Sequence, residues 1–355
     1  MDRTAFGPLA VTWNVIRGDT APLAAVSPEI LSISPTRNTA TKARVTMHRS
    51  RRIRISTRSS PMAVHQAEQV AAGLNRLGAE TELIKLTTAG DRWMGDLAAL
   101  GGKGAFVKEI DGALLNDQAD VAVHCLKDIP GDVPIPPGLT FAAYLAREDV
   151  HDAVISGTGA ALSDLPAGAR VGTSSVRRTA QLRLHHPHLD IQPLRGNVNT
   201  RLARLGEGHF DAIIAAVSGL RRVGQQHRIT ETLTVEQMCP PIGAGIIVLQ
   251  CRDDDGEVEQ LAAQLDHPGT RRQATAERAM LHALQGHCNS PIAGLATDAP
   301  GGRIVLRGTV FSADGSRWLD AQDWGVDDDP EALGFFIGSN LLRQGARRLI
   351  DDIPH

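Results

Sequence analysis

Residues 169–178 read ARVGTSSVRR, and this stretch decides the fold class. Its first four residues form a short strand-like run, and the hydroxyl residues 173–175 precede the helical pattern of residues 176–185. The same order of strand, polar turn and helix recurs in residues 53–78 and 191–205. Strands that alternate with helices indicate βαβ units, so we expect an α/β fold with a mostly parallel sheet.

The C-terminal part of the sequence has a different pattern. Strand-like runs at residues 304–311 and 318–324 flank the sequence ADGS at residues 313–316, which is typical of a hairpin turn. A long amphipathic segment, residues 330–350, closes the chain. This pattern predicts a separate small α+β domain from about residue 266.

The composition limits the class of protein. The formal net charge of the 355-residue chain is only −3, so no general electrostatic attraction to nucleic acid or to an anionic membrane is expected. Its apolar runs are far shorter than the roughly 20 residues that a membrane span needs. The four cysteines lack the spacing of a zinc site or a disulfide framework, and this favours a reducing cytoplasm and no metal.

Residues 1–51 mix Pro, Ser, Thr and Arg without a clear period. We expect a disordered leader, or an incorrectly assigned start with Met47 as the true initiator. A transit peptide is a weaker alternative, because the segment carries Asp2, Asp19 and Glu29.

Hydroxyl and arginine side chains gather at three expected helix starts, in residues 57–60, 173–178 and 195–201. A helix N-terminus offers unpaired N–H groups, and arginine adds donors that match carboxylate or phosphate. The alternative is that the hydroxyls are ordinary helix caps and the arginines are solvated. Because such turns lie at the carboxyl ends of strands, we expect one cleft that binds a ligand with several anionic groups.

Residues 121–130 read VAVHCLKDIP, an apolar strand that ends in charged residues. Asp128 lies just past the strand end, where a catalytic acid is well placed, although a turn-capping role is the simpler alternative. Catalysis near neutral pH requires desolvation or a charge partner for this carboxyl. Lys127 is the charged neighbour in sequence, but adjacent side chains on a strand point in opposite directions.

A polar loop at residues 286–291 reads GHCNSP. Cys288 in this loop is a better candidate for a reactive thiol than Cys251, which ends an apolar run. A catalytic pair of Cys288 with the adjacent His287 is weakly supported, because such partners are neighbours in space rather than in sequence. The glycine-rich residues 101–104 lack the spacing of a nucleotide-binding loop.

Several segments together resemble the hydroxymethylbilane synthase (porphobilinogen deaminase) family, over nearly the whole chain from about residue 52. In order along the chain they are STRSSP (56–61), GGKGAFVKE (101–109), VHCLKDIP (123–130), GTSSVRR (172–178), LRGNV (194–198) and TAERA (275–279).

The resemblance implies a fold of two periplasmic-binding-protein-like lobes with mixed, mostly parallel sheets, plus a small α+β C-terminal domain. Domain 1 is then discontinuous, with residues 52–146 and 244–263. Domain 2 has residues 147–243, and domain 3, residues 266–355, carries the cofactor cysteine.

The resemblance also implies the reaction, in which four porphobilinogen molecules join head to tail with loss of ammonia and water then releases hydroxymethylbilane. The implied cofactor is a dipyrromethane attached through Cys288, and the implied catalytic residue is Asp128. The implied cofactor- and substrate-binding residues are Arg58, Ser60, Lys127, Thr173, Ser174, Ser175, Arg177, Arg178, Arg195, Gly196, Arg201 and Arg222. Porphobilinogen is the expected partner of a cytoplasmic monomer with no nucleic-acid or membrane partner.

The sequence departs from the family pattern at three positions, with His287 and Asn199 where the family usually has Gly and Ala244 where it usually has Gln. The segment 87–102, which resembles a mobile loop of the family, lacks the usual Arg before Gly90. Two alternatives stay open: a divergent paralogue that acts on a related pyrrole, and a non-catalytic two-lobe binding protein for an anionic small molecule. The second alternative needs neither Asp128 nor Cys288.

Overall fold

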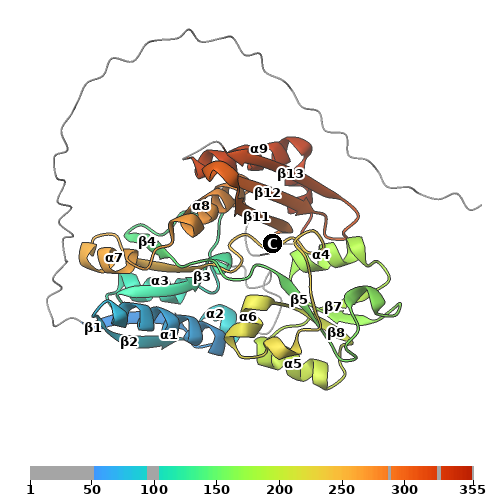
Figure 1. Cartoon of the computed structure of the whole chain (residues 1–355), viewed down its shortest axis with the longest axis horizontal. Helices are drawn as coiled ribbons and strands as arrows, with labels where there is room; N and C mark the ends of the chain where they lie inside the picture. Colours follow the sequence, from blue (N-terminus) through green and yellow to red (C-terminus); the bar gives the residue numbers. More distant parts are fainter. Residues whose placement is uncertain (1–51, 94–103, 287–288, 326–328, 354–355) are drawn as a thin grey trace, which may run out of the picture. The chain divides into compact units, whose positions relative to one another are not determined.

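The computed structural model describes residues 52–93, 104–286, 289–325 and 329–353, all within the compact unit of residues 49–355. The expected leader therefore lies outside the described residues. Within the described ranges, no helix is both long and apolar enough to cross a membrane. The described chain forms three sheets with their helices (Figure 1).

The first sheet has five strands in the order β2-β1-β3-β10-β4. The pairs β1–β2 and β1–β3 are parallel, whereas β10 runs antiparallel to both β3 and β4. The strands are β1 (Arg52–Arg58), β2 (Glu80–Leu86), β3 (Val121–Cys125), β4 (Leu139–Tyr144) and β10 (Ile247–Arg252). Its helices are α1 (Pro61–Arg76), α2 (Ala89–Arg92), α3 (Lys108–Leu115) and α7 (Gly256–Ala263), and the 3-10 turn η2 (Leu126–Asp128) follows β3.

Helix α1 shows why the predicted strand-turn-helix unit forms. Ser60 caps the helix by accepting a hydrogen bond from the Ala63 N–H, and Pro61 occupies the first turn, where its missing N–H costs nothing. The buried residues Ala67, Val70 and Leu74 lie on one helical face, as their spacing predicts.

The second sheet has the order β7-β6-β8-β5-β9, with parallel pairs β6–β7 and β6–β8 and antiparallel pairs β5–β8 and β5–β9. Its strands are β5 (Asp152–Ser156), β6 (Arg170–Gly172), β7 (Asp190–Gln192), β8 (Ala212–Ala216) and β9 (Glu231–Thr232). Its helices are α4 (Val176–His185), α5 (Val198–Gly206) and α6 (Val217–Arg222), with the 3-10 turns η3 (Leu162–Asp164) and η4 (Gln226–Arg228). Helix α4 has the predicted bounds, and α5 ends one residue after the predicted unit of residues 191–205.

The two five-stranded sheets share one topology. The fourth strand in the order is β10 in the first sheet and β5 in the second. Each of these is the first strand that the chain forms after it crosses over from the other sheet, and each runs antiparallel to both of its neighbours. Parallel and antiparallel pairs are therefore equal in number in each sheet. Together with the C-terminal part, this arrangement confirms the predicted class of mixed α/β lobes plus a small α+β part.

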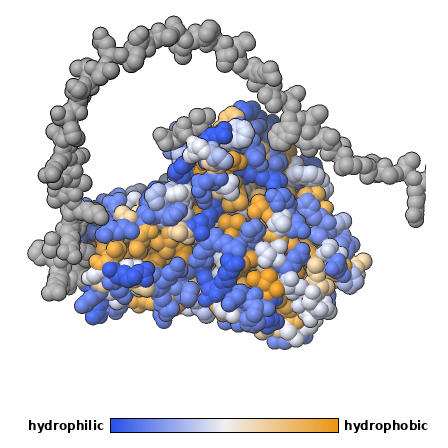
Figure 2. Space-filling view, viewed as in Figure 1, coloured by the Kyte–Doolittle hydropathy of each residue, from blue (hydrophilic) through white to orange (hydrophobic). Residues whose placement is uncertain are grey.

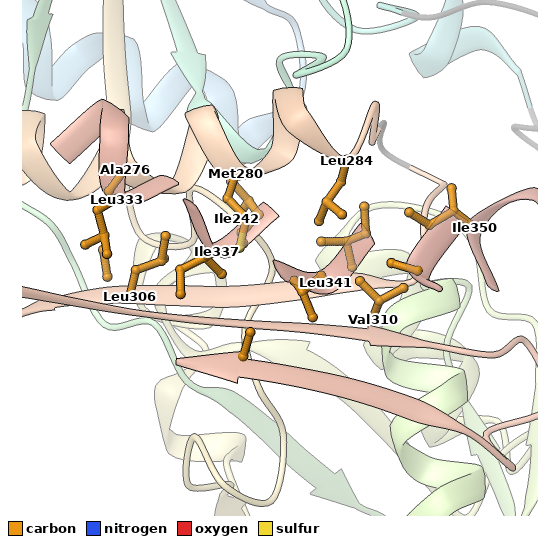
Figure 3. Close-up of a cluster of buried hydrophobic side chains, with 14 of the residues drawn as sticks. Ile242, Ala276, Met280, Leu284, Leu306, Val310, Leu333, Ile337, Leu341 and Ile350 are labelled. Atoms are coloured by element: carbon orange, nitrogen blue, oxygen red, sulfur yellow. The ribbon is translucent and has the colours of Figure 1, made fainter. Parts of the chain in front are cut away.

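The C-terminal sheet is antiparallel, with the order β11-β12-β13. It consists of β11 (Ile292–Asp298), β12 (Ile304–Phe311) and β13 (Trp318–Gly325), with the 3-10 turn η5 (Pro300–Gly302) and the helices α8 (Pro268–Ala283), α9 (Pro330–Gln344) and α10 (Ala346–Asp351). Met280, Ile337 and Leu341 pack over Leu306 and Val310 in its core (Figure 3). The predicted hairpin turn joins β12 to β13. The predicted amphipathic segment of residues 330–350 forms two helices, which are separated at Gly345 with its left-handed φ of 102°.

The two connecting segments and the C-terminal part meet at Glu277 of α8, which is fully buried. Its carboxylate accepts hydrogen bonds from Arg147 Nη1 at 2.7 Å, from Gly243 N at 2.7 Å and from Ala296 N at 2.8 Å. Arg147 lies on the first connection between the sheets and Gly243 on the second. One carboxylate thus ties both connections to the C-terminal sheet, with its charge compensated by arginine.

Candidate active site

Asp128 and Arg58 lie together at the carboxyl ends of neighbouring parallel strands. Arg58 ends β1, Asp128 ends the 3-10 turn after β3, and Arg58 Nη1 is 3.5 Å from Asp128 Oδ2. Because parallel strands end at the same edge of a sheet, the topology brings together residues 70 positions apart. Arg58 is thus a charge partner of Asp128 that the local sequence did not reveal.

Arg58 is also held by Asp91 of α2 and by Phe106. The Arg58 Nε lies 3.2 Å from Asp91 Oδ1, and the guanidinium lies 4.2 Å from the centre of the Phe106 ring. Burial would lower the pKa of Arg58, but the hydrogen bond to Asp91 and the charges of Asp128 and Asp91 outweigh it and raise that pKa. Burial would likewise raise the pKa of Asp91, but Arg58 holds it below its usual range. Arg58 is therefore a permanent cation between two carboxylates.

The arginines at the start of α4 are buried and paired with one carboxylate. Asp152, at the start of β5, accepts hydrogen bonds from Arg177 Nη2 at 2.6 Å and from Arg178 Nε at 2.9 Å and Nη2 at 2.6 Å. Burial would raise the pKa of Asp152, but the two guanidinium charges keep it well below its usual range. Arg177 and Arg178 are thus positioned by an internal acid and carry one net positive charge with it.

The hydroxyl residues ahead of α4 have local roles and one unused oxygen. Ser175 caps α4 by accepting from Arg178 N, and Thr173 Oγ1 accepts from Ser175 N at 3.2 Å. Within the described residues, the buried Ser174 Oγ has no hydrogen-bond partner. A buried hydroxyl without a partner is costly, so this oxygen is suited to contact a ligand.

Arg201 of α5 is a half-buried cation near other cations. Its Nε donates to Gly196 O at 2.8 Å, and no carboxylate among the described residues forms an ion pair with it. Burial, together with repulsion from Arg178 and Arg195, lowers the pKa of Arg201 to about 10. Gly196 has a φ of 109°, and a Cβ there would lie 2.9 Å from Thr200 Cβ, so the turn requires glycine. Positive charge is concentrated at this end of the second sheet, as an anion site requires.

A small cavity joins residues of the two α/β lobes. It has a volume of about 10 Å³, enough for one water molecule, and Lys127, Asp152, Arg178 and Ala244 are among its lining residues. Arg222, at the end of α6, lies 3.0 Å from Glu148 Oε2 and contacts the Cys125 sulfur of β3 at 3.9 Å. The structure therefore brings the predicted residues Lys127 and Arg178 to one cavity and Arg222 to the neighbouring strand β3.

The second connection passes very close to residue 127. Gly243 has a φ of 73°, and a Cβ there would lie 2.8 Å from Lys127 N. The backbone can approach the Lys127–Asp128 turn this closely only because residue 243 is glycine.

Ser60 remains an N-cap whose hydroxyl hydrogen is available to donate.

Cys288 and His287 lie outside the described residues, as do Gly101, Gly102 and Lys103. The described neighbours of the cysteine loop are Gly286, which is buried, and Asn289, which is half-buried, between α8 and β11. Within the described ranges, no group of three or more His, Cys, Asp or Glu side chains is arranged to hold a metal ion.

Comparison with known families decides the assignment. Residues 53–260 match the family described as porphobilinogen deaminase, dipyromethane cofactor binding domain, and residues 272–343 match porphobilinogen deaminase, C-terminal domain. The chain belongs to the porphobilinogen deaminase family. It is 53% identical over 305 residues to porphobilinogen deaminase 2 of Streptomyces coelicolor, covering 85% of this chain and 97% of that one. It is 48% identical over 304 residues to porphobilinogen deaminase of Acidithiobacillus ferrooxidans, covering 85% and 98%.

Part of the chain also aligns with solved structures of low sequence identity. A periplasmic substrate-binding protein of an ABC transporter from Coxiella burnetii aligns with a TM-score of 0.38 and 16% identity, over 64% of this chain and 96% of that one. A putative methionine-binding lipoprotein from Bacillus subtilis aligns with a TM-score of 0.39 and 13% identity, over 62% and 92%.

Three acids in this porphobilinogen deaminase family member were missed from the sequence: Asp91, Asp152 and Glu277. The sequence contained a signal for the pairing of Asp152, because a charged residue that opens the apolar strand DAVIS must be paired if the strand is buried. Glu277 lies on the buried face of α8, and the same argument applies. Asp91 follows Thr88 with the spacing of a capping box, which the structure contains.

Proposed function

We propose that this protein is a hydroxymethylbilane synthase, which joins four porphobilinogen molecules head to tail with loss of ammonia and releases hydroxymethylbilane with water. Its family and its near full-length similarity to two porphobilinogen deaminases support the proposal. The structural observation that carries it is a carboxylate, Asp128, 3.5 Å from Arg58, next to Lys127, which lines one cavity with the buried Arg178. This arrangement suits the extension of a pyrrole chain rich in acetate and propionate groups.

The residues of the site fit a dipyrromethane cofactor. Among the described residues, Ser174 Oγ has no hydrogen-bond partner and Arg201 has no ion pair. Burial, the main cause, lowers the pKa of Arg201 to about 10. A carboxylate of the cofactor can accept a hydrogen bond from the hydroxyl and pair with the guanidinium. When bound, the cofactor supplies the primer to which pyrrole units are added. We assign its attachment to Cys288 on the family resemblance, because a thiolate is a far better nucleophile than a hydroxyl and forms a thioether that resists hydrolysis.

The arginines divide into binding and positioning groups in this proposal. Arg58, Arg195, Arg201 and Arg222, with Lys127, bind carboxylates of cofactor and substrate. Arg177 and Arg178 add positive charge and are oriented by Asp152. Further donors are the hydroxyls of Ser60, Thr173, Ser174 and Ser175 and the backbone at Gly196.

Asp128 handles protons and stabilises positive charge. Its carboxylate oxygens accept and return protons near the pyrrole nitrogens, and its negative charge favours the cation that forms when ammonia leaves. Arg58, at 3.5 Å, holds the carboxylate in place. Because Asp91 holds the opposite side of Arg58, the guanidinium keeps its orientation without the ligand.

The residue ranges proposed for the three domains agree with several contacts. The pairing of β10 with β3 and β4 supports a domain 1 of residues 52–146 and 244–263. Residues 147–243 and 266–355 then form domains 2 and 3. We further propose a cytoplasmic monomer without a nucleic-acid or membrane partner, which light scattering after size-exclusion chromatography would test for oligomeric state.

The test combines a product assay with intact mass. The purified chain should convert porphobilinogen to hydroxymethylbilane and carry the added mass of a dipyrromethane, and both should be lost in Cys288→Ser. Cys251→Ser is the matched control and should keep both, since its thiol is fully buried in β10. An active protein without added mass would refute the cofactor assignment, and conversion of only a related pyrrole would favour a divergent paralogue.

A further inference from the structure

A second, larger cavity lies beside the site but includes none of its proposed residues. Its volume is about 160 Å³, and it is bounded by α3, the loop after η2, β4, β10 and α8. Most of its wall is apolar and includes Ile129, Pro130, Val133 and Phe141. Such a volume is comparable to cavities of roughly 150 Å³ that bind a benzene ring. The cavity is therefore large enough for one small ring.

One acid in this cavity lacks a partner. Asp111, on the first turn of α3, lines the cavity, and its buried Oδ1 has no hydrogen-bond partner among the described residues. The nearest candidate, His124 Nε2, lies 4.0 Å away and bonds Gln250 Oε1 at 3.1 Å. Burial lowers the pKa of His124 to about 4, so the ring is neutral, and burial raises the pKa of Asp111 to about 6. A ligand ammonium would satisfy this carboxyl with a charge-assisted hydrogen bond.

Two cations lie elsewhere on the cavity wall. Arg278 of α8 donates to Ile129 O at 3.4 Å and to Pro130 O at 3.1 Å, and its guanidinium lies 5.5 Å from the Phe141 ring centre. These bonds leave further N–H donors on the guanidinium. Lys108 is exposed at the same wall. The cavity wall thus carries one carboxyl group and two cations around an apolar volume.

Hydrophobic residues also gather on the surface over α3, the helix that carries Asp111 and Lys108 (Figure 2). Leu115 at the end of this helix is 49% exposed, and Val133 on the cavity wall is 38% exposed. An apolar rim of this kind favours entry of a ring rather than of a bare ion.

We propose that this cavity is a second binding site, for a small aromatic ring that carries an ammonium group and a carboxylate. The ammonium pairs with Asp111, the ring packs against Phe141 and the prolines of the loop, and the carboxylate pairs with Arg278 or Lys108. The site is separate from Asp128, so its ligand binds without being consumed. The inference rests on the cavity itself and not on the proposed reaction.

The test uses 4-(aminomethyl)benzoate as the probe, with benzylamine and benzoate as its two halves, titrated into the full chain by calorimetry. The whole probe should bind more tightly than either half. Asp111→Asn should weaken the binding of the probe and of benzylamine by roughly tenfold or more, and should leave benzoate unchanged. Asp164→Asn, an exposed acid of η3 that does not line the cavity, is the matched control and should bind like the parent. No binding to the parent chain, or unchanged binding to Asp111→Asn, would overturn the proposal.

A second variant keeps the proposal testable if Asp111→Asn does not fold. Val133→Phe places a larger side chain in the cavity from a partly exposed position, so it should abolish binding of all three compounds without loss of thermal stability. Parent-like affinity in this variant would show that the cavity is not the site. Asp128→Asn should bind the probe like the parent, because Asp128 does not line the cavity. If the parent chain binds the probe but does not convert porphobilinogen, the proposed function fails and this site stands.

Discussion

The two five-stranded sheets share one strand order but carry different chemistry at their carboxyl ends. The first sheet brings two acids, Asp91 and Asp128, to one arginine, Arg58. The second brings Arg178 to Arg201 and provides one fully buried acid, Asp152. The same topology therefore places two acids around one arginine at the edge of one lobe and two arginines around one acid at the edge of the other, because the side chains at the strand ends differ.

The largest effect should come from the first edge. Asp128→Asn removes the proton-accepting carboxylate and its negative charge but keeps its size. We expect turnover of porphobilinogen to fall by roughly 10²–10⁴-fold, the range for loss of a general acid or base. The measurement is the steady-state rate, with circular dichroism to show that the fold is retained. Near-normal turnover would remove Asp128 from the mechanism.

The second largest effect should be on stability and should come from the second edge. Asp152→Asn leaves Arg177 and Arg178 buried without their carboxylate, at a cost of about 3–5 kcal/mol in the free energy of unfolding. Asp91→Asn breaks the corresponding pair in the first lobe, where the side chains are more exposed, and should cost clearly less. Urea denaturation of both variants measures the difference. Equal losses would contradict the contrast between the two edges.

A smaller effect is expected for Arg201. Arg201→Gln removes a half-buried cation that has no acidic partner among the described residues, so the melting temperature should not fall. The KM for porphobilinogen should rise by roughly tenfold, because a charge-assisted contact to a carboxylate is lost. Arg170→Gln, which breaks a solvent-exposed pair with Asp211, is the control and should leave KM unchanged. A large loss of stability in Arg201→Gln would make this residue structural.

The smallest effects should appear in the pH dependence of stability. The folded pKa of His124, about 4, is below its unfolded value of about 6.5, so its contribution is present above pH 6.5 and is lost as the pH falls towards 4. The folded pKa of Asp111, about 6, is above its unfolded value of about 3.9, so its contribution is present at low pH and is lost as the pH rises through 6.

These two contributions oppose each other between about pH 4 and 6. Asp152 makes stability sensitive to acid only below about pH 4, the usual pKa of an aspartate, because its folded pKa is lowered. Urea denaturation at several pH values should therefore show a steeper loss of stability on acidification in Asp111→Asn than in the parent. His124→Gln should show the opposite change, a shallower loss of stability on acidification than in the parent. Parallel profiles for the two variants would show that these groups do not titrate as described.

Part of the site was predictable from local sequence. Ser60, Ser175 and the predicted start of α4 follow from capping chemistry, which acts within a few residues. Arg58 and Asp128 were recognised separately, but their contact depends on β1 and β3 being neighbours in the sheet. Asp152 was missed because its partners are 25 and 26 positions away.

The amino-acid sequence by itself determined the alternation of strands and helices, the hairpin at residues 313–316 and, through its motifs, the family. These features depend on residue periodicity, turn preference and the order of short segments. Only the tertiary structure decided which carboxylate compensates which arginine, that β10 pairs antiparallel with β3 and β4, and that Asp111 Oδ1 faces a cavity without a hydrogen-bond partner among the described residues. The physical reason is that burial and ion pairing depend on contacts between segments far apart in the chain, which no local pattern encodes.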